Sequence, residues 1–429
     1  MTDDAVGRTA LRKITVRLVP YLFALYVVAY LDRVNVSFAS LQMNADLGFS
    51  DTVFGFGSGL FFVGYMLFQI PSNLLLMRVG ARRLIASLML VWGCLSVGMM
   101  FTRGELSFYA LRFLLGLAEA GFFPGVILYL TMWFPARTRA RTVSLFMTAT
   151  AVAGILGGPI SGAILTMEGT HGLAGWHWLF LLEGIPAVLL GVSTWHYLTD
   201  RPSEARWLTP EEKDWLHAQL SDERERAPDG AAGSLVDALE SGRVWLLSFI
   251  YFCLVCSMYS VTLWMPQIVK GFSASSDLVV GLLTAIPYSA AAIGMVAVGH
   301  HSDQTGERHW HVFVPAMVSA CGLVMTGTVT RPDLALLALS LAALGLWGTV
   351  GPFWTLPPAV LRGSGTAVGI ALVNSLGNLG GFVGPLLVGW LKDVTHHFSA
   401  GLYGLAGLLV IGAFLTLGLR TTESGRKPP

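Results

Sequence analysis

One stretch decides the fold: ITVRLVPYLFALYVVAYLDRVNV, residues 14–36. It is long and apolar enough to cross a bilayer, which takes about 20 residues of α-helix. Its last turns nevertheless carry Asp32 beside Arg33, and an ionised side chain at the bilayer centre costs roughly 2.5–3.5 kcal/mol on insertion scales. Either the two residues form an internal ion pair that fixes helix packing, or they belong to a site that binds a charged solute or carries a proton.

The composition of the whole chain is that of a membrane protein. Of 429 residues, 54% are hydrophobic and 12% are charged, whereas soluble domains carry about 25% charged residues. The net charge of +1 gives no reason to expect a nucleic-acid partner. The four cysteines (Cys94, Cys253, Cys256 and Cys321) lie in apolar stretches, so we expect packing residues there, with no disulfide framework, metal or cofactor.

Twelve apolar stretches of about 20 residues predict twelve transmembrane helices. The expected fold class is therefore an all-α membrane protein with two six-helix halves. We expect an N-terminal bundle at 1–198, a cytoplasmic central loop at 199–243 and a C-terminal bundle at 244–429. The predicted spans are 14–36, 53–77, 83–102, 106–131, 141–165, 177–198, 244–269, 277–299, 311–329, 333–357, 365–391 and 400–419.

Lysines and arginines are distributed unevenly over the loops between these spans. Of the 27, 21 fall on the side of the N-terminus, and four (Arg103, Lys270, Arg331 and Lys392) fall on the other side. Because cytoplasmic loops carry an excess of Lys and Arg, we expect both termini and the central loop in the cytoplasm. The sequence thus predicts a multi-pass protein of the cytoplasmic (inner) membrane.

The central loop contains a predicted helix. Thr209-Pro-Glu-Glu212 has the form of a capping box with Pro at the first helical position. Trp215, Leu216 and Leu220 then form an apolar face. We expect this short amphipathic helix to lie against the cytoplasmic ends of the bundle as a brace between the halves. A site for a regulatory partner is the alternative.

The two halves repeat weakly in sequence. The loop after the second span (NLLLMRVGARR) and the loop after the eighth (GHHSDQTGERH) occupy the same place, and Gly80 matches Gly306 at an offset of 226. A Gly-xxx-Gly-Pro motif recurs at the same offset, beginning at Gly154 and at Gly380. Duplicated halves with a binding site at their interface are a recurrent plan among transporters.

The second of these loops resembles the Gly-xxx-Asp-Arg-x-Gly-x-Arg signature of the major facilitator superfamily. Gln304 stands where the signature has Arg. The resemblance implies two pseudo-symmetric six-helix halves with a central cavity between them, and loops that take part in gating. The residues expected to act in these loops are Gly80, Arg82, Arg83, Asp303, Gly306 and Arg308.

Motifs in the first half narrow this resemblance. Tyr30-Leu-Asp-Arg-Val-Asn35, Arg112-FLLGLAEAGFFPG and Trp133-Phe-Pro-Ala-Arg137 are similar to the anion:cation symporter family, whose members include transporters of tartrate, phthalate, hexuronates and sugar acids. The resemblance extends over essentially the whole chain. It implies a small organic anion as substrate, the lipid bilayer as surroundings and a proton as the coupling ion, with no cofactor.

Helical geometry sorts the ionisable residues of the first span. At 100° per residue, Tyr26, Tyr30 and Arg33 fall on one stripe, while Asp32 is turned about 100° from Arg33. We therefore expect Arg33 and the tyrosines to line the central path. Asp32 is expected to point sideways toward another helix.

The fourth span offers a partner for Asp32. Arg112 and Glu119 are seven residues apart, so they share one face of a helix. If that face meets the first span, the three residues form one charged cluster. Burial favours a protonated carboxyl and a nearby Arg favours the carboxylate. A carboxyl balanced between these effects can take up a proton when its Arg is drawn elsewhere.

The family resemblance implies the same roles. The residues matching Asp32 and Glu119 are the proton carriers of the family, and the residue matching Arg33 binds the substrate carboxylate. A planar guanidinium suits a carboxylate because it donates two parallel hydrogen bonds. The alternatives are a static ion pair at Arg33, an Arg112 that only holds Glu119 in place, and a structural Glu183.

Neutral side chains complete the candidate pocket. Asn374 and Asn378 lie one turn apart in the eleventh span, and Asn378 matches an Asn that the family associates with substrate. Tyr259 and Trp354 are further candidates, with packing as the alternative. The four histidines between residues 300 and 311 lack acidic or Cys ligands at metal spacing, so we expect solvated side chains there.

The sequence thus predicts a proton-coupled symporter that imports a small organic carboxylate by alternating access, acting as a monomer. An efflux pump or exchanger of the same fold is one alternative, and a non-transporting membrane solute sensor is a remote one. An enzyme is not expected, because no nucleophile–base or metal constellation lies at membrane depth. Hydroxylated dicarboxylates, sugar acids and aromatic acids all remain open as substrates.

Overall fold

The computed structural model describes the chain at residues 3–226, 235–361 and 366–419. Every described element is a helix, and twelve helical segments are long and apolar enough to cross a membrane. The prediction of an all-α protein with twelve spans is confirmed. The first six spans are α1 (Asp3–Leu47), α2 (Asp51–Val79), α3 (Ala81–Gly98), α4 (Glu105–Glu119) continued by α5 (Phe122–Trp133), α6 (Ala136–Leu165) and α7 (Gly175–Tyr197).

The last six spans repeat this pattern after a central segment. That segment holds α8 (Pro210–Arg226) and α9 (Leu235–Glu240), and short 3-10 turns lie at Met99–Phe101, Thr170–Gly172 and Pro202–Glu204. The spans are α10 (Gly242–Ser273), α11 (Asp277–Thr305), α12 (His309–Thr328), α13 (Pro332–Gly348) continued by α14 (Val350–Val360), α15 (Thr366–Asn378) continued by α16 (Gly380–Thr395), and α17 (Phe398–Leu417).

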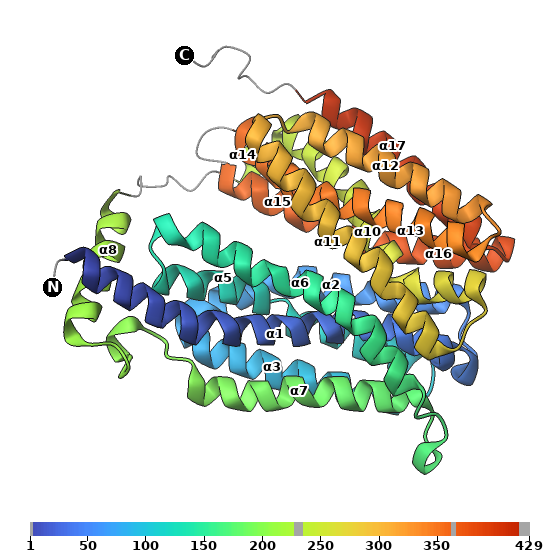
Figure 1. Cartoon of the computed structure of the whole chain (residues 1–429), viewed down its shortest axis with the longest axis horizontal. Helices are drawn as coiled ribbons and strands as arrows, with labels where there is room; N and C mark the ends of the chain where they lie inside the picture. The colour runs from blue at the N-terminus through green and yellow to red at the C-terminus, as the bar shows by residue number, and fades with distance from the viewer. Residues whose placement is uncertain (1–2, 227–234, 362–365, 420–429) are drawn as a thin grey trace.

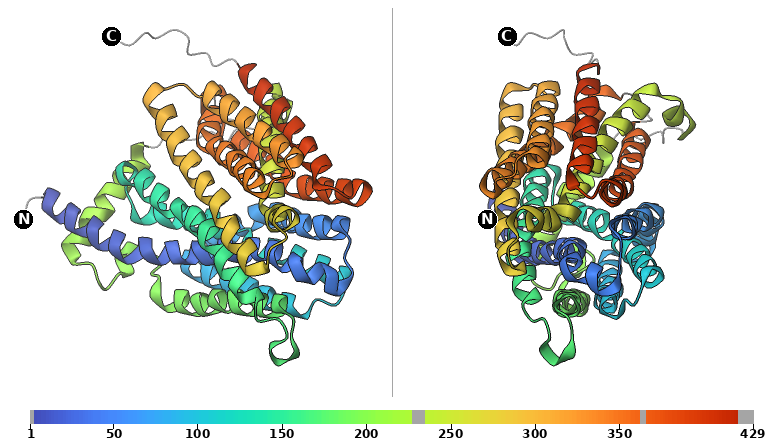
Figure 2. Two further views of the ribbon diagram at one scale, coloured as in Figure 1. Left: turned by 45° about the vertical axis from the view of Figure 1, so that its right-hand side comes forward. Right: turned by 90° about the vertical axis from the view of Figure 1, so that its right-hand side faces the viewer.

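The two sets of six spans form two layers that face each other (Figure 1). We call α1–α7 the first half and α10–α17 the second half; two further views of the layers are given in Figure 2. Three spans break into two helices each. Glu119 ends α4 and Asn378 ends α15 at such breaks. Discontinuous helices at the interface of repeats are a common place for binding sites in transporters.

Glycines bring the halves together in two matching places. A Cβ on Gly158 of α6 would lie 2.4 Å from the Gly281 carbonyl oxygen of α11, and a Cβ on Gly55 of α2 would lie 2.4 Å from the Pro385 carbonyl oxygen of α16. No real Cβ approaches so closely, so these crossings require glycine. Gly55 and Gly281 are 226 residues apart, which is the offset of the sequence repeat.

Polar contacts join the halves at the end of the bundle where α1 ends and α2 begins. Lys392 Nζ lies 2.8 Å from Asp51 Oδ1. Asp393 accepts hydrogen bonds from the Thr52 backbone N–H at 2.8 Å and from the Thr52 hydroxyl at 2.5 Å. We call this end the closed end. The opposite end, where α1 begins, is called the open end.

Helix α8 of the central segment packs against the first half, whereas α9 contacts α10 and α15 of the second half. The Thr209 N–H donates to Glu212 at 2.9 Å, and the Glu212 N–H lies 3.3 Å from the Thr209 hydroxyl, so the predicted capping box is confirmed. Lys13 pairs with Glu212 at 2.8 Å, and Arg139 pairs with Glu223 at 3.0 Å. Both basic partners belong to the first half. The expectation that α8 braces the two halves is therefore wrong for these ion pairs, because both cations that form them belong to the first half.

Candidate functional site

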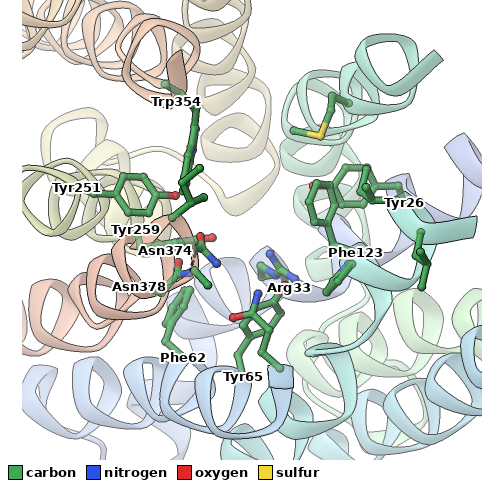
Figure 3. Close-up of a pocket in the computed structure, with 18 of the residues that line it drawn as sticks. Tyr26, Arg33, Phe62, Tyr65, Phe123, Tyr251, Tyr259, Trp354, Asn374 and Asn378 are labelled. Carbon is green, nitrogen blue, oxygen red and sulfur yellow. Dashed lines mark hydrogen bonds between the residues drawn. The ribbon is translucent and has the colours of Figure 1, made fainter. Parts of the chain in front are cut away.

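A cavity of about 910 Å³ lies between the halves. Its walls come from α1, α2, α5 and α6 of the first half and from α10, α14 and α15 of the second. Figure 3 shows side chains of the two walls facing one another across it. Of the residues predicted to bind substrate, those that line the cavity are Arg33, Tyr259, Trp354, Asn374 and Asn378.

Tyr30 departs from the prediction, because it does not belong to the lining of the cavity, whereas Tyr26 does. Tyr26 and Arg33 are seven residues apart and share a stripe of α1. Tyr30 is turned about 40° from Tyr26 at 100° per residue. This rotation takes its side chain toward the second half, where Tyr288 of α11 is a neighbour.

Arg33 faces the cavity and is the one charged residue among those that line it in the described structure. Its Nη2 and Nε lie 2.9 and 3.2 Å from Glu119 Oε2. Its guanidinium stands 5.4 and 5.3 Å from the ring centroids of Phe61 and Tyr65. Glu119 is 1% exposed, and its Oε1 has no hydrogen-bond partner among the described residues. A buried carboxylate thus neutralises the cation of the cavity.

Arg112 lies behind this pair and is 1% exposed. Its guanidinium stands 5.0 Å from the Phe61 ring centroid, so Phe61 is close to the guanidiniums of both Arg33 and Arg112. The Nε and Nη2 atoms of Arg112 have no hydrogen-bond partner within the described chain. Glu119 shares the face of α4 with Arg112, as predicted, but it forms its ion pair with Arg33. The contact that the guanidinium of Arg112 makes is thus with the ring of Phe61, and the charge of Glu119 also acts on it.

The expected cluster of Asp32 with Arg112 and Glu119 is wrong. Asp32 is turned off the cavity stripe, as helical geometry requires, but it meets α3 and not α4. Trp92 Nε1 donates to its Oδ2 at 3.0 Å, and Ser96 Oγ donates to its Oδ1 at 2.8 Å. The rotation of a helix fixes the direction of a side chain, but not which neighbouring helix packs there. The proton-carrying roles of these residues stay predictions.

The second half forms its wall of the cavity from uncharged groups. Asn378 Nδ2 lies 3.2 Å from Asn374 Oδ1, and the rings of Tyr251 and Trp354 are 4.8 Å apart. Sequence reasoning missed Tyr251, and it also missed Tyr65 on the opposite wall. Aromatic residues make up 11% of the chain, so one more tyrosine in a span gives no signal that marks it as a lining residue.

The two repeated loops at the open end share a backbone feature. Gly80 and Gly306 have positive φ angles of 89° and 69°, a region that glycine adopts without strain. In the first loop, Arg82 pairs with Asp200 of the central segment, with Nε 3.3 Å from Oδ2. The loop of the first half is thereby tied to the end of the sixth span.

The loop of the second half is closed on itself instead. Arg308 pairs with Asp303 at 2.7 Å, and it also donates to Ser302 at 2.9 Å. The predicted gating residues thus meet different partners in the two halves. Arg83 is exposed. Gating by either loop stays a prediction.

Histidines beside the second loop bond to one another. His301 Nδ1 lies 2.7 Å from His311 Nε2, and His311 Nδ1 lies 2.9 Å from Glu307 Oε2. Partial burial acts to raise the pKa of Glu307, but hydrogen bonds from the Trp310 backbone N–H and from His311 outweigh it and hold this pKa below its usual value. In the described part of the chain, no group of three or more His, Cys, Asp or Glu residues is placed to hold a metal ion.

Known proteins are similar to this chain in sequence. Residues 22–385 match the Major Facilitator Superfamily. Over its full length the chain is 51% identical to an Agrobacterium vitis protein named "Putative tartrate transporter", 98% of which is covered. Over 95% of its length it is 41% identical to the "Quinolone resistance transporter" of Acinetobacter baumannii, 94% of which is covered.

A solved structure shares the fold. The crystal structure of a bacterial homolog of the human lysosomal transporter Spinster, in an inward-facing and unoccupied conformation, matches with a TM-score of 0.81 at 16% identity, covering 97% of this chain and 99% of that one. At this identity the likeness shows the fold alone. The family match spans most of the chain and agrees with the twelve helices and the cavity between two halves. The chain therefore belongs to the major facilitator superfamily of membrane transporters.

Proposed function

We propose that the protein is a proton-coupled symporter that imports a small organic carboxylate by alternating access. The observation that carries this proposal is the state of Arg33. It is the one charged residue lining the described cavity, and Glu119 holds it at 2.9 Å. A carboxylate substrate therefore competes with Glu119 for the same guanidinium.

A proton on Glu119 resolves this competition. Leaving one partner of a buried pair as an unpaired charge costs about 3–5 kcal/mol, so an incoming carboxylate displaces an ionised Glu119 only at that cost. A protonated Glu119 releases Arg33, whose guanidinium then donates two hydrogen bonds to the substrate. After the substrate leaves, Glu119 gives up its proton and the ion pair forms again. Proton and substrate are thus bound together, as symport requires.

Small hydroxylated carboxylates are the substrate class that we propose. Around Arg33 the cavity offers the amides of Gln69, Asn374 and Asn378 together with tyrosine hydroxyls. One substrate carboxylate binds the guanidinium, and the amides and hydroxyls bind the hydroxyl groups of the substrate. The name of the Agrobacterium vitis relative, which refers to tartrate, supports this choice.

We further infer that the open end faces the cytoplasm and that the protein lies in the inner membrane. The excess of Lys and Arg in the loops at the open end supports this orientation. The contacts of Asp51 and Thr52 with Lys392 and Asp393 then shut the cavity from the outside. Import requires these contacts to break in part of the cycle. One chain supplies all walls of the cavity, which supports a monomer as the transporting unit.

Counterflow and gradient-driven uptake in proteoliposomes test this proposal. In counterflow, labelled tartrate exchanges for unlabelled tartrate without net proton movement. We expect Glu119→Gln and Asp32→Asn to retain exchange and to lose accumulation driven by a pH gradient. Glu105→Gln is the matched control, because Glu105 is an exposed carboxylate outside the cavity. Unimpaired gradient-driven accumulation in both the Glu119 and the Asp32 variant would contradict the proposal.

Efflux of organic anions is the second candidate. The relative named for quinolone resistance is the observation that favours it. Right-side-out membrane vesicles with an inward proton gradient distinguish the two directions. A symporter accumulates labelled carboxylate under this gradient, whereas a proton-driven exporter expels carboxylate that was loaded beforehand.

A further inference from the structure

A buried carboxyl group outside the cavity has no role in the cycle described above. Glu183 lies in the middle of α7 and is 5% exposed. Ser161 of α6 donates a hydrogen bond to its Oε1 at 2.7 Å. Because Ser161 lies one turn before α6 ends at Leu165, Glu183 is located toward the closed end of the first half.

No cation faces Glu183 in the ranges that the structure describes. The helices α1, α3 and α6 pack against α7. From α1 the titratable neighbour is Asp32. From α3, uncharged Ser96 lies against Gly184, and from α6 the neighbour is Ser161. The arginines of α3 and α6 all lie in the first two turns of these helices, at the open end.

Asn35 joins Glu183 to Asp32. It is 1% exposed, its Nδ2 lies 3.4 Å from Asp32 Oδ1, and Glu183 is its other carboxyl neighbour. An amide side chain donates through nitrogen and accepts through oxygen. Asn35 can therefore donate to one carboxyl group and accept from the other. That arrangement is satisfied when one carboxyl is ionised and the other is protonated.

The charge balance of the first half leads to the same result. Its described core holds the carboxyl groups of Asp32, Glu119 and Glu183 and the guanidiniums of Arg33 and Arg112. Arg33 is bound by Glu119. The groups that donate hydrogen bonds to Asp32 are neutral, and Glu119 and Glu183 are the charged groups that act on it. Two ionised carboxylates beside each other in a low dielectric, with no cation between them, strongly disfavour one another.

We propose that Asp32 and Glu183 form a carboxyl pair that shares one proton, and that this pair is a proton-binding site separate from Glu119. When the proton moves from Glu183 to Asp32, the O–H bond at Glu183 breaks and one forms at Asp32. Glu183 then carries the negative charge and accepts hydrogen bonds from Ser161 and Asn35. A role of the pair in transport rests on the proposed proton coupling, but the shared proton does not.

Infrared difference spectroscopy of the purified full-length protein detects this proton, because a protonated carboxyl has a C=O stretch that a carboxylate lacks. We expect a protonated-carboxyl band at neutral pH. Glu183→Gln removes the like charge beside Asp32, so the pH midpoint of the band falls by about one unit, and Asp32→Asn does the same. Glu105→Gln leaves the band unchanged, because Glu105 is an exposed carboxylate outside this pair.

Ser161→Ala is a second variant that keeps both carboxyl groups and removes only a donor to Glu183. We expect it to shift the frequency of the band, and it serves as the test if Glu183→Gln does not fold. A wild-type protein with no protonated carboxyl at neutral pH, or a Glu183→Gln variant with an unchanged midpoint, would overturn the proposal. If the band behaves as expected but the wild type shows no uptake driven by a pH gradient, symport fails and the shared proton stands.

Discussion

The two halves of the molecule share a framework but not a chemistry. Matching glycines hold matching helix crossings, at Gly55 and at Gly281. Yet the described core of the first half buries several charged side chains, whereas that of the second half buries none. The wall that the second half gives to the cavity is built from amides and aromatic rings. We infer that the first half carries the charge and proton chemistry and that the second half recognises the shape and hydroxyl groups of the substrate.

Replacing Arg33 gives the largest expected effect. Arg33→Lys keeps the charge but loses the paired hydrogen bonds of the guanidinium. Hydrogen bonds to charged groups are each worth about 1.5–3 kcal/mol, so we expect labelled tartrate uptake in proteoliposomes to fall about 100-fold. Arg103→Lys, at an exposed position near the closed end, is the control. A loss of less than about tenfold would show that the first half does not bind the substrate anion.

Breaking the contacts at the closed end comes second. Asp393 of the second half accepts hydrogen bonds from the backbone N–H groups of Asp51 and Thr52, at the start of α2 in the first half. Asp393→Ala removes these bonds, worth about 1–2 kcal/mol together. The fraction of molecules in which the two halves are separated at the closed end therefore rises about tenfold. Spin labels at Glu105 and His397, both exposed, measure the distance between the halves.

Asp333→Ala is the control for this measurement. Asp333 is also a carboxylate of the second half, but its partner is Arg331 in the same half. We expect its distance distribution to match that of the parent protein. If Asp393→Ala also leaves the distribution unchanged, the contact between halves at α2 does not hold the closed end shut.

Features of the fold and site that depend on residues within one helix could be predicted from the sequence. Apolar length alone identified the twelve spans, because each span must cover the bilayer by itself. The 100° rotation per residue correctly placed Arg33 on the cavity side of α1 and turned Asp32 away from it. The capping box of α8 was also found, because Thr209 and Glu212 are only three residues apart.

Contacts between helices were harder to predict. Asp32 was assigned to α4, but Trp92 and Ser96 of α3 bind it. Arg33, on the cavity stripe of α1, forms the ion pair with Glu119 instead. Nothing in the spacing of residues within one helix encodes which neighbour lies beside it. For the same reason, the sequence did not indicate that Lys13 and Arg139, which form ion pairs with α8, both belong to the first half.

A moderate effect is expected from the neutral wall. Asn378→Ala removes one neutral hydrogen-bonding group, worth about 0.5–1.5 kcal/mol, so the KM for tartrate rises about fivefold. The pH dependence of uptake and the accumulation ratio stay unchanged, because no proton-binding group is altered. Ser340→Ala is the control, since Ser340 bonds within its own helix, away from the cavity. Loss of proton coupling in Asn378→Ala would contradict the inference that the first half alone carries the proton chemistry.

The smallest effect is expected outside the membrane. Glu212 is 4% exposed and bonds to Lys13 and to the Thr209 N–H, so Glu212→Gln should lower the free energy of unfolding by about 1 kcal/mol. Its neighbour Glu211 is exposed, which makes Glu211→Gln a matched control without effect in a thermal-shift assay. Because the ion pairs of α8 lie with the first half, both variants should transport at the wild-type rate. A transport defect in Glu212→Gln alone would mean that α8 couples the two halves, so that the asymmetry between them extends beyond the buried core.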